Sequence, residues 1–283
     1  MKSLIAIVAM LAMALVMTGA SASAPAVVVD HAKVNATFGA RGAGNNGSIT
    51  SSPIRTVGNT RTKPGEAEIH ENVADVFMVM EGGSTFVTGG KVIGGKSTGP
   101  GEIKGTSVEG GKTIQLTKGD VVIVPAGVPH WHKAIDKSIT YYTVKVPKSA
   151  AAPGGGEAVY VPHDKVNVAF GKRTGGQAGR IATSPIRVVG NQRNTPGEAE
   201  IHENVADVFM VMEGGSTFVS GGTVVGGKTT APGEIKGTGV DGGETRQLSK
   251  GDVVVVPAGV PHWHKAITGG SIVYYTVKVP KSS

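Results

Sequence analysis

The sequence predicts an all-β fold with two tandem domains, and three observations lead to that prediction. Gly (44 residues) and Pro (15 residues) are abundant in a chain of 283 residues, which indicates many tight connections. Runs rich in β-branched and aromatic residues, such as "DVFMVMEGGSTFVTGG", recur between these connections. No long apolar stripe with a period of 3.6 residues follows the N-terminal segment. Short strands separated by regularly spaced turns favour a β-sandwich or a β-barrel, and the jelly roll is one fold of this kind.

The N-terminal segment 1–24 has the layout of a secretory signal peptide. Lys2 precedes an unbroken apolar run from Leu4 to Met17, and "TGASASA" then offers small-residue cleavage positions after Ala22 or Ala24. The run is short for a membrane span and no second run follows, so an uncleaved anchor is the weaker alternative. We therefore expect a secreted or periplasmic protein with no membrane contact after signal cleavage.

Composition excludes several classes of site. The chain has no cysteine, which excludes disulfides, thiol catalysis and sulfur-based metal sites. Its formal net charge of +7 is scattered among Gly and Thr, with no basic helix and no aromatic platform between arginines. This charge indicates solubility or adhesion to an acidic surface, and we expect no nucleic-acid partner.

The chain is an internal duplication, and this predicts its domains. "HAKVNATFG" at 31–39 matches "HDKVNVAFG" at 163–171, and the stretch 64–87 is identical to 196–219. A segment rich in Pro, Ala and Gly separates the copies and predicts a solvated, structureless linker. The predicted order is a signal peptide at 1–24, a first domain at 25–147, a linker at 148–157 and a second domain at 158–283.

Within each copy the elements are expected to be strands. "DVFMVMEGGSTFVTGG" predicts a strand, a Gly-Gly turn and another strand. "GDVVIVPAGVPHWHKAI" predicts a strand, a Pro/Gly turn and a strand, and "SITYYTVKV" predicts a final strand. The Gly-rich stretch 88–117 is expected at the mouth of the barrel, where it can shape substrate access.

Alternation along two of these strands predicts a cluster of titratable side chains. Residues two apart share a face of a strand, so Glu66, Glu68 and His70 point one way, and His130 and His132 also share a face. Such side chains inside a small barrel are costly unless a partner satisfies them, and a divalent cation does so. With no sulfur present, imidazole and carboxylate suit Zn, Mn, Fe or Cu. The alternative is a metal-free barrel in which Glu68 pairs with His132 or His130 as a buried ion pair.

The spacing around these histidines resembles the cupin superfamily. Its second motif, G-x5-P-x-G-x2-H-x3-N, is similar to Gly119, Pro125, Gly127 and His130, with Ala134 at the Asn position. The second copy repeats this with Gly251, Pro257, Gly259, His262 and Ala266. The resemblance covers most of both copies and implies a bicupin, that is, two tandem double-stranded β-helix (jelly-roll) barrels.

The first motif of that superfamily, G-x5-H-x-H-x3–4-E-x6-G, is matched less closely. His70 takes the place of its second His, Asp75 stands at the Glu position, and Glu68 stands where the first His belongs. The set of metal ligands that the resemblance implies is Glu68, His70, Asp75 and His130 in the first copy, and Glu200, His202, Asp207 and His262 in the second.

His132 and His264 are additional to that set. Each either replaces a weak ligand or acts as a catalytic acid or base beside the metal, because a histidine near neutrality suits proton transfer. The "HWH" letters are also similar to those of small manganese cupins with lyase activity, in which the second His is free for catalysis.

The expected function is that of an exported bicupin enzyme that depends on a divalent transition metal (Mn, Fe, Zn or Cu). Its substrate would be a small oxygenated molecule, such as a sugar, an organic acid or a phenolic, in oxidative or lyase/isomerase chemistry. The alternatives are a non-catalytic module that binds carbohydrate or another small ligand, and a structural or storage-type bicupin. The two domains are expected to pack as an intrachain pseudo-dimer, and further oligomerisation is open.

Overall fold

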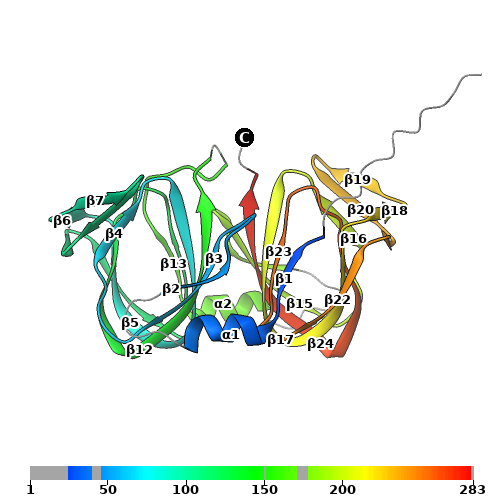
Figure 1. Cartoon of the computed structure of the whole chain (residues 1–283), viewed down its shortest axis with the longest axis horizontal. Coiled ribbons are helices and arrows are strands. Elements are labelled where there is room, and N and C mark those ends of the chain that lie inside the picture. Colours follow the sequence, from blue (N-terminus) through cyan, green and yellow to red (C-terminus); the bar gives the residue numbers. More distant parts are fainter. Residues whose placement is uncertain (1–24, 40–45, 150, 171–177, 282–283) are drawn as a thin grey trace, which may run out of the picture.

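The computed structural model describes residues 25–39, 46–149, 151–170 and 178–281. The predicted signal peptide lies outside the described residues. Figure 1 shows two β barrels side by side, each built mainly from one copy of the repeat. No helix in the described ranges has the length and apolar character needed to cross a membrane. The all-β prediction, with two tandem jelly-roll barrels, is confirmed.

The first copy contributes twelve strands and one helix within the described residues. They are β1 (Val27–Val29), α1 (His31–Gly39), β2 (Asn46–Thr50), β3 (Thr56–Arg61), β4 (Ala67–His70), β5 (Val73–Thr88), β6 (Lys91–Ile93), β7 (Lys96–Gly99), β8 (Glu102–Gly105), β9 (Ser107–Glu109), β10 (Lys112–Thr117), β11 (Val121–Val124) and β12 (His130–Pro147).

The second copy repeats this order. Its elements are β13 (Val159–Val161), α2 (His163–Phe170), β14 (Ala178–Ala182), β15 (Arg187–Arg193), β16 (Ala199–His202), β17 (Val205–Ser220), β18 (Thr223–Val225), β19 (Lys228–Ala231), β20 (Glu234–Gly237), β21 (Gly239–Asp241), β22 (Glu244–Ser249), β23 (Val253–Val256) and β24 (His262–Pro280).

Two long antiparallel strands form the centre of each barrel. In the first barrel β5 and β12 pair along most of their length, and the sheet continues in the order β13-β11-β5-β12-β4-β8-β7. In the second barrel β17 and β24 have these places, in the order β1-β23-β17-β24-β16-β20-β19. On its other side, the first half of β5 pairs with β11 and the second half with β10, and β17 pairs in the same way with β23 and β22.

The prediction of a Gly-Gly turn inside each copy is wrong, because β5 runs through Gly82 and Gly83 without reversing. Gly82 has a φ of +74°, and a Cβ there would lie 1.9 Å from the carbonyl oxygen of Ser138 on β12. The register of the pair also shifts between Asp136 and Ile139. The glycines therefore bend a continuous strand at a bulge, where a side chain would collide with the partner strand. The two strands predicted over 130–147 are likewise one strand, β12.

The two short helices were not predicted from the sequence. The carboxylate of Asp30 caps α1 by accepting a hydrogen bond from the backbone N–H of Lys33, at 3.1 Å. Val34 and Thr37 of α1 are buried. A helix of nine residues holds only two turns of apolar periodicity, which is too little to distinguish it from a polar loop.

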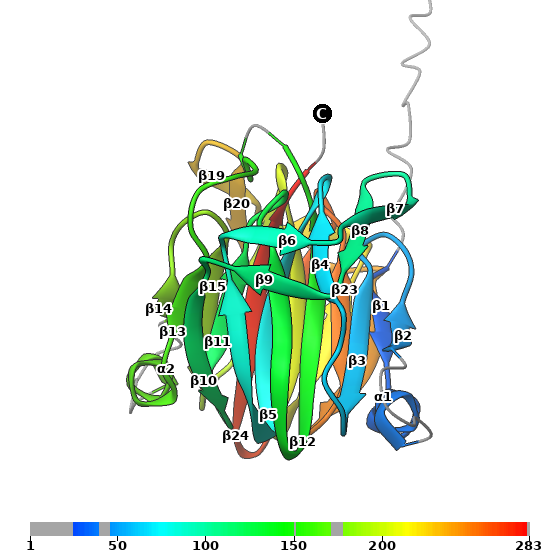
Figure 2. The same cartoon turned by 90° about the vertical axis from the view of Figure 1, so that its left-hand side faces the viewer.

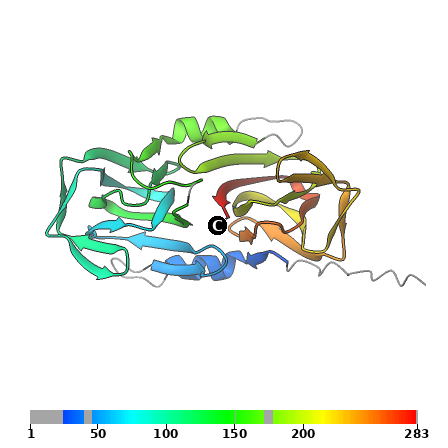
Figure 3. The same cartoon turned by 90° about the horizontal axis from the view of Figure 1, so that it is seen from above.

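The first strand of each copy pairs with the barrel formed by the other copy. β1 pairs with β23 of the second barrel, with Val27 opposite Val255, whereas β13 pairs with β11 of the first barrel, with Val159 opposite Ile123. Figure 1 shows β1 beside β23 and β13 within the opposite barrel. Seen from above, α1 and α2 lie on opposite sides of the molecule (Figure 3). Strand pairing therefore crosses between the two halves of the sequence duplication, and the predicted domain boundaries stay a prediction.

A shared apolar core joins the barrels into the expected pseudo-dimer. Alternate residues of β5 face opposite ways: Phe77 packs in the interior of the first barrel, and Met78 packs in a cluster that includes Val208 and Met210 of the second. Both faces of these strands are buried, which explains their almost continuous apolar sequence. The predicted linker also contributes, because Ala152 is buried in the shared cluster rather than solvated.

Most of the Gly-rich stretch 88–117 forms short outer strands, whereas its last strand, β10, pairs with β5 in the main sheet. β6 pairs with β9 as a separate ribbon that crosses the end of the first barrel (Figure 2). β7 and β8 form a hairpin, and β8 adds to the main sheet beside β4. This hairpin contributes two charged residues to the site described below.

Candidate metal centre

Strand register brings the predicted ligands of the first barrel together. β4 pairs with β12 so that Glu68 lies opposite His130. β12 pairs with β5 so that Lys145 lies opposite Asp75. These contacts join two motifs that are some sixty residues apart in the chain, and they place their polar side chains inside the barrel.

Three of these side chains form a compact group of potential donors. The nearest donor atoms of Glu68, His70 and His130 all lie within 4.8 Å of one another. Nε2 of His70 is 3.7 Å from Oε2 of Glu68, and the two imidazole rings have centroids 5.1 Å apart. Two imidazoles and a carboxylate are a donor set that transition metals accept. The second barrel has the equivalent group of Glu200, His202 and His262.

Hydrogen bonds at the other ring nitrogens settle the tautomers of both histidines. Nδ1 of His70 lies 2.6 Å from Oε2 of Glu102, and Nδ1 of His130 lies 3.2 Å from the carbonyl oxygen of Val128. A carbonyl oxygen or an ionised carboxylate only accepts, so each Nδ1 carries the proton. In the neutral form of each ring, Nε2 then has its lone pair directed into the site, as a metal ligand requires.

Asp75 lies beside this group but is already paired. It is buried, and its carboxylate oxygens lie 2.8 and 2.9 Å from Nζ of Lys145. Burial alone would raise the pKa of Asp75, but Lys145 and then His70 hold it well below its usual range. Oδ2 of Asp75 is 3.4 Å from Nε2 of His70. Asp75 is thus an ionised neighbour of the donor group, and its place as a ligand stays a prediction.

Lys145 is a site residue that sequence reasoning missed, as is Glu102. Besides its pairing with Asp75, its ammonium group donates to Nε2 of His70 at 3.0 Å. A metal and this lysine would therefore compete for the same lone pair. Alternation along "TYYTVKV" was the available signal, because it places Tyr141, Thr143 and Lys145 on one face of β12, with a lysine among inward-facing residues.

The charges around the two histidines act on them differently. Burial lowers the pKa of both groups, but the hydrogen bond and charge of Asp75 outweigh it at His70, whose pKa is raised. His130 is more deeply enclosed, and its pKa is lowered. Burial would raise the pKa of Glu68, but His130 and Arg61 lower it, so this carboxylate is ionised at neutral pH.

His132 lies deeper in the barrel, apart from the three grouped donors. Its Nδ1 is 2.9 Å from Oγ of Ser84, and its ring packs against Phe86 and Tyr141 with centroids 5.0 and 5.1 Å away. Its buried Nε2 has no hydrogen-bond partner among the described residues. Burial, followed by the charge of Arg61, holds the pKa of His132 well below its usual value, so the ring is neutral. Its role as a ligand or as a proton carrier stays a prediction.

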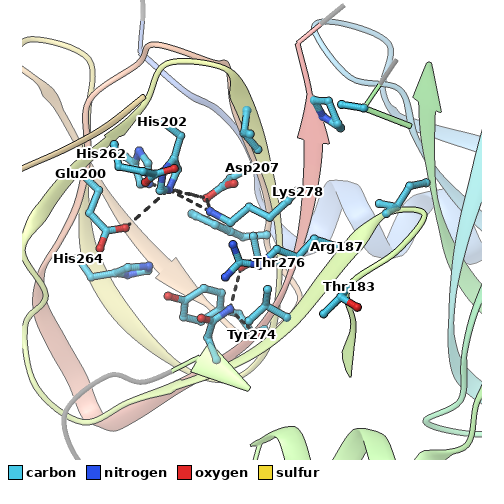
Figure 4. A pocket seen from close by; sticks show the side chains of 18 of the residues that line it. Thr183, Arg187, Glu200, His202, Asp207, His262, His264, Tyr274, Thr276 and Lys278 are labelled. Carbon is cyan, nitrogen blue, oxygen red and sulfur yellow. Dashed lines mark hydrogen bonds and ion pairs between the residues drawn. The ribbon is translucent and has the colours of Figure 1, made fainter. Parts of the chain in front are cut away.

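The second barrel repeats these contacts, and Figure 4 shows its Glu200, His202, Asp207, His262, His264 and Lys278 from close by. Nζ of Lys278 lies 2.8 Å from Asp207 and 3.0 Å from Nε2 of His202, and Oγ of Ser216 lies 2.8 Å from Nδ1 of His264. Nδ1 of His262 bonds the carbonyl oxygen of Val260 at 3.1 Å, and Glu200 faces Nε2 of His202 at 3.7 Å. The two candidate centres are therefore alike in composition and in geometry.

Each centre opens onto a hollow. In the second barrel one hollow of about 540 Å³ extends from His264 and Tyr274 past the centre to Arg187 and Thr183. In the first barrel an inner hollow of about 30 Å³ adjoins His132, and an outer one of about 580 Å³ adjoins His70 and Lys145. Hollows of several hundred Å³ suit a small molecule and are too narrow for a macromolecule.

Comparison with known proteins identifies the family. A family model described as Cupin matches residues 66–153 and 191–281, which together make up more than half of the chain. These two matches contain all of the candidate ligands in both barrels. No curated protein matches the chain in sequence.

Solved structures with a similar fold include several oxalate decarboxylases. One, from a study of substrate binding and reaction specificity, has 12% identity and a TM-score of 0.57, covering 93% of this chain and 79% of that chain. A variant of Bacillus subtilis oxalate decarboxylase OxdC has 13% identity and a TM-score of 0.57 with the same coverage. A Bacillus subtilis oxalate decarboxylase studied for its Mn(II) centres has 13% identity and a TM-score of 0.50, covering 81% of this chain and 69% of that chain. At these identities the likeness shows the fold alone.

Proposed function

The chain belongs to the cupin family and is a bicupin, and from the side chains inside its barrels we propose that it is an exported enzyme dependent on a divalent metal. One observation carries this proposal. In each barrel two imidazole Nε2 atoms and a carboxylate converge within 4.8 Å, and both imidazoles have their Nδ1 protons engaged elsewhere. The proposed ligands are Glu68, His70 and His130, with Glu200, His202 and His262 in the second barrel.

A bound divalent metal would polarise an oxygen of the substrate and stabilise negative charge that develops there. The chain's own residues would do the rest. Lys145 would give up its hydrogen bond to His70 and keep its pairing with Asp75, since both carboxylate oxygens lie within 2.9 Å of its ammonium group. His132, which is neutral and directed at the inner hollow, would accept or return a proton within the barrel.

Among sugars, organic acids and phenolics, the charges around the hollows favour an organic acid as the substrate. Three cationic residues, Arg187, Lys236 and Lys278, line the hollow of the second barrel beside three carboxylates, Glu200, Asp207 and Glu234. Its counterpart in the first barrel has Arg55, Lys104 and Lys145 beside Glu68 and Glu102. A divalent cation would add further positive charge, which a small carboxylate would offset. The relatives in fold act on oxalate according to their names, and oxalate is an organic acid.

Export is proposed from residues 1–24, and it places the substrate outside the cytoplasm. N-terminal sequencing of the protein from culture medium or periplasm would test it. We expect a mature chain that begins at Ser23 or Pro25, after cleavage at Ala22 or Ala24. A chain that retains Met1 in every fraction would contradict export.

Metal analysis of the purified mature protein is the main test. We expect close to two equivalents of a transition metal per chain after loading with Mn, Fe, Zn or Cu, and a loss of both in a His70→Ala/His202→Ala variant. Less than a tenth of an equivalent in the wild type would overturn the metal proposal. With metal bound, turnover should appear first among small mono- and dicarboxylic acids.

A second candidate function is a metal-free module that binds a small ligand. The observation in its favour is Lys145, which already supplies a cation to Asp75 and a hydrogen bond to His70. Tight binding of an organic acid by protein stripped with chelator, unchanged when metal is restored, would favour this function over the enzyme.

A further inference from the structure

The β7–β8 hairpin is attached directly to the strand that carries two of the proposed ligands. β8 pairs with β4 so that Glu102 lies opposite His70 and Lys104 lies opposite Glu68. The turn of the hairpin is bound next to the end of β4 that carries His70, because the N–H of Glu71 donates to the carbonyl oxygen of Gly101 at 2.8 Å. Gly101 has a φ of +73°, and a Cβ there would lie 2.5 Å from Nδ2 of Asn72. The hairpin therefore sits at a defined place beside the site.

Glu102 controls which nitrogen of His70 is protonated. Its Oε2 lies 2.6 Å from Nδ1 of His70, and the equivalent distance from Glu234 to His202 is 2.5 Å. These are short, charge-assisted hydrogen bonds, and they keep the proton on Nδ1. Without them only the hydrogen bond from Lys145 to Nε2 favours this tautomer, and the opposing tautomer can donate from Nε2 to Oδ2 of Asp75, 3.4 Å away. Nε2 would then lose its lone pair in part of the population.

Lys104 has a related effect on Glu68. Its Nζ lies 3.5 Å from Oε1 of Glu68, whereas Oε2 of Glu68 faces Nε2 of His70 at 3.7 Å. Lys104 also contacts Glu66 at 3.2 Å, which holds its side chain along β8. One oxygen of Glu68 is thus engaged outside the centre and the other is directed into it.

We propose that the β7–β8 hairpin, and β19–β20 in the second barrel, is a positioning element for the metal centre. Glu102 and Glu234 hold the ligand histidines in the Nδ1–H tautomer, and Lys104 and Lys236 orient the ligand carboxylates. This inference rests on the proposed metal centre, but its first consequence, the tautomer of the histidines, exists without any metal. Partners of this kind typically change metal affinity by about 10- to 100-fold.

The first experiment uses the metal-free full-length mature protein. Nitrogen chemical shifts of the imidazoles, measured by ¹⁵N NMR, report which ring nitrogen carries the proton. We expect His70 and His202 to be Nδ1–H tautomers in the wild type and mixed or Nε2–H tautomers in Glu102→Ala/Glu234→Ala. Unchanged tautomers in this variant would overturn the inference, whatever metal the protein binds.

The second experiment is a calorimetric titration with ZnCl₂. Glu102→Ala/Glu234→Ala should bind Zn²⁺ about 10- to 100-fold more weakly than the wild type. Glu102→Gln/Glu234→Gln, which keeps an accepting oxygen without the charge, should recover part of that loss. The matched control, Glu109→Gln/Asp241→Asn, removes exposed carboxylates from the neighbouring β9 and β21 and should leave the affinity within twofold of the wild type.

The two proposals fail in different ways. If the wild type binds no Zn²⁺ and the tautomers respond to Glu102 as expected, the metal function fails and the positioning role stands. If the wild type binds Zn²⁺ and the alanine variant binds it equally well, the metal function stands and the positioning role is overturned. Circular dichroism of each variant confirms folding, which we expect because the side chain of Glu102 is 43% exposed.

Discussion

The two barrels have the same candidate centre and different surroundings. Inside, the proposed ligands, the lysine and the deep histidine recur with distances that agree to about 0.1 Å, as in the contact of His70 with Asp75 and of His202 with Asp207, both 3.4 Å. Outside, the first barrel is covered by β13, in which the hydroxyl of Tyr160 donates to Asp120 at 3.1 Å. The second barrel is covered by β1, which has Val28 at the corresponding place.

A second difference lies in β10 and its counterpart β22. Ile114 is buried in the core of the first barrel, whereas the equivalent Arg246 is 57% exposed in its side chain and pairs with Glu244. The geometry of the candidate centre is the same despite these changes. The centre is therefore determined by β4, β5, β8 and β12 and their pairing, and not by the strands that cover the barrel.

The largest expected effect comes from removing the lysine in one barrel at a time. Lys145→Met leaves Asp75 buried without its cation, which should lower the free energy of unfolding of the metal-free protein by about 3–5 kcal/mol. Lys278→Met should do the same through Asp207. Urea denaturation measures both. Lys118→Met is the control, because this exposed lysine also pairs with a carboxylate, Glu81, and should cost less than about 1 kcal/mol.

The same lysine variants sharpen the comparison with metal present. Without Lys145, Nε2 of His70 has no competing donor, and Asp75 becomes available to a cation. Added Zn²⁺ should therefore restore most of the lost stability in both variants. Restoration in only one variant would show that the barrels differ in metal binding despite having the same candidate centre.

The next largest effect is expected from removing one ligand histidine in one barrel at a time. His70→Ala should abolish one equivalent of bound metal and leave the second barrel occupied, and His202→Ala should do the reverse. We expect the affected site to weaken by at least about 100-fold, equivalent to ~2.8 kcal/mol. Metal content measured by mass spectrometry after desalting tests this, and a loss of both equivalents from either variant would contradict independent centres.

A smaller effect tests the difference in β10. Ile114→Arg places a charged residue where the first barrel has a buried apolar one, and should destabilise the protein by about 2 kcal/mol. Arg246→Ile, the reciprocal change at an exposed position, should alter stability by no more than about 0.5 kcal/mol. Thermal unfolding compares the two. Equal effects would show that the backbone, and not the side chain, sets the burial of this position.

The smallest effect concerns Tyr160. Tyr160→Phe removes its hydrogen bond to Asp120 and should cost about 1 kcal/mol or less at neutral pH. Burial, followed by the charge of Asp120, raises the pKa of Tyr160 to about 12. A pKa raised on folding means that this contribution is present below pH 10 and is lost as the pH rises toward 12. Wild type and variant should therefore converge in stability over that range, and a constant difference up to pH 12 would contradict this assignment.

Sequence and structure agree where a pattern is local or repeated. The strands and the shared face of Glu68 and His70 follow from letters within a few residues of each other. The duplication follows from stretches that recur in both halves of the chain. The turn predicted at Gly82 and Gly83 was wrong for a physical reason, because a glycine pair serves equally well at a hairpin turn and at a bulge. Which of these it is depends on the carbonyl of Ser138, more than fifty residues away.

The residues missed by sequence reasoning share one property. Lys145 and Glu102 act through cross-strand neighbours, Asp75 and His70, that are distant in the chain. Glu102 and Lys104 repeat the i, i+2 spacing of His70 and Glu68, but this correspondence has meaning only once β8 is known to pair with β4.

By itself the sequence determined that this protein is all-β, duplicated, free of cysteine and equipped with histidines and carboxylates at the spacing of a cupin. Composition, internal repeats, motif spacing and period-two alternation suffice for that, because all of them can be seen without knowing which strands pair. Tertiary structure alone decided the exchange of β1 and β13 between the barrels, the pairing of Lys145 with Asp75 and the contact of Glu102 with His70. The reason is that the choice of partner strand, which the pattern along a single strand does not identify, selects the cross-strand neighbour of every inward-facing side chain.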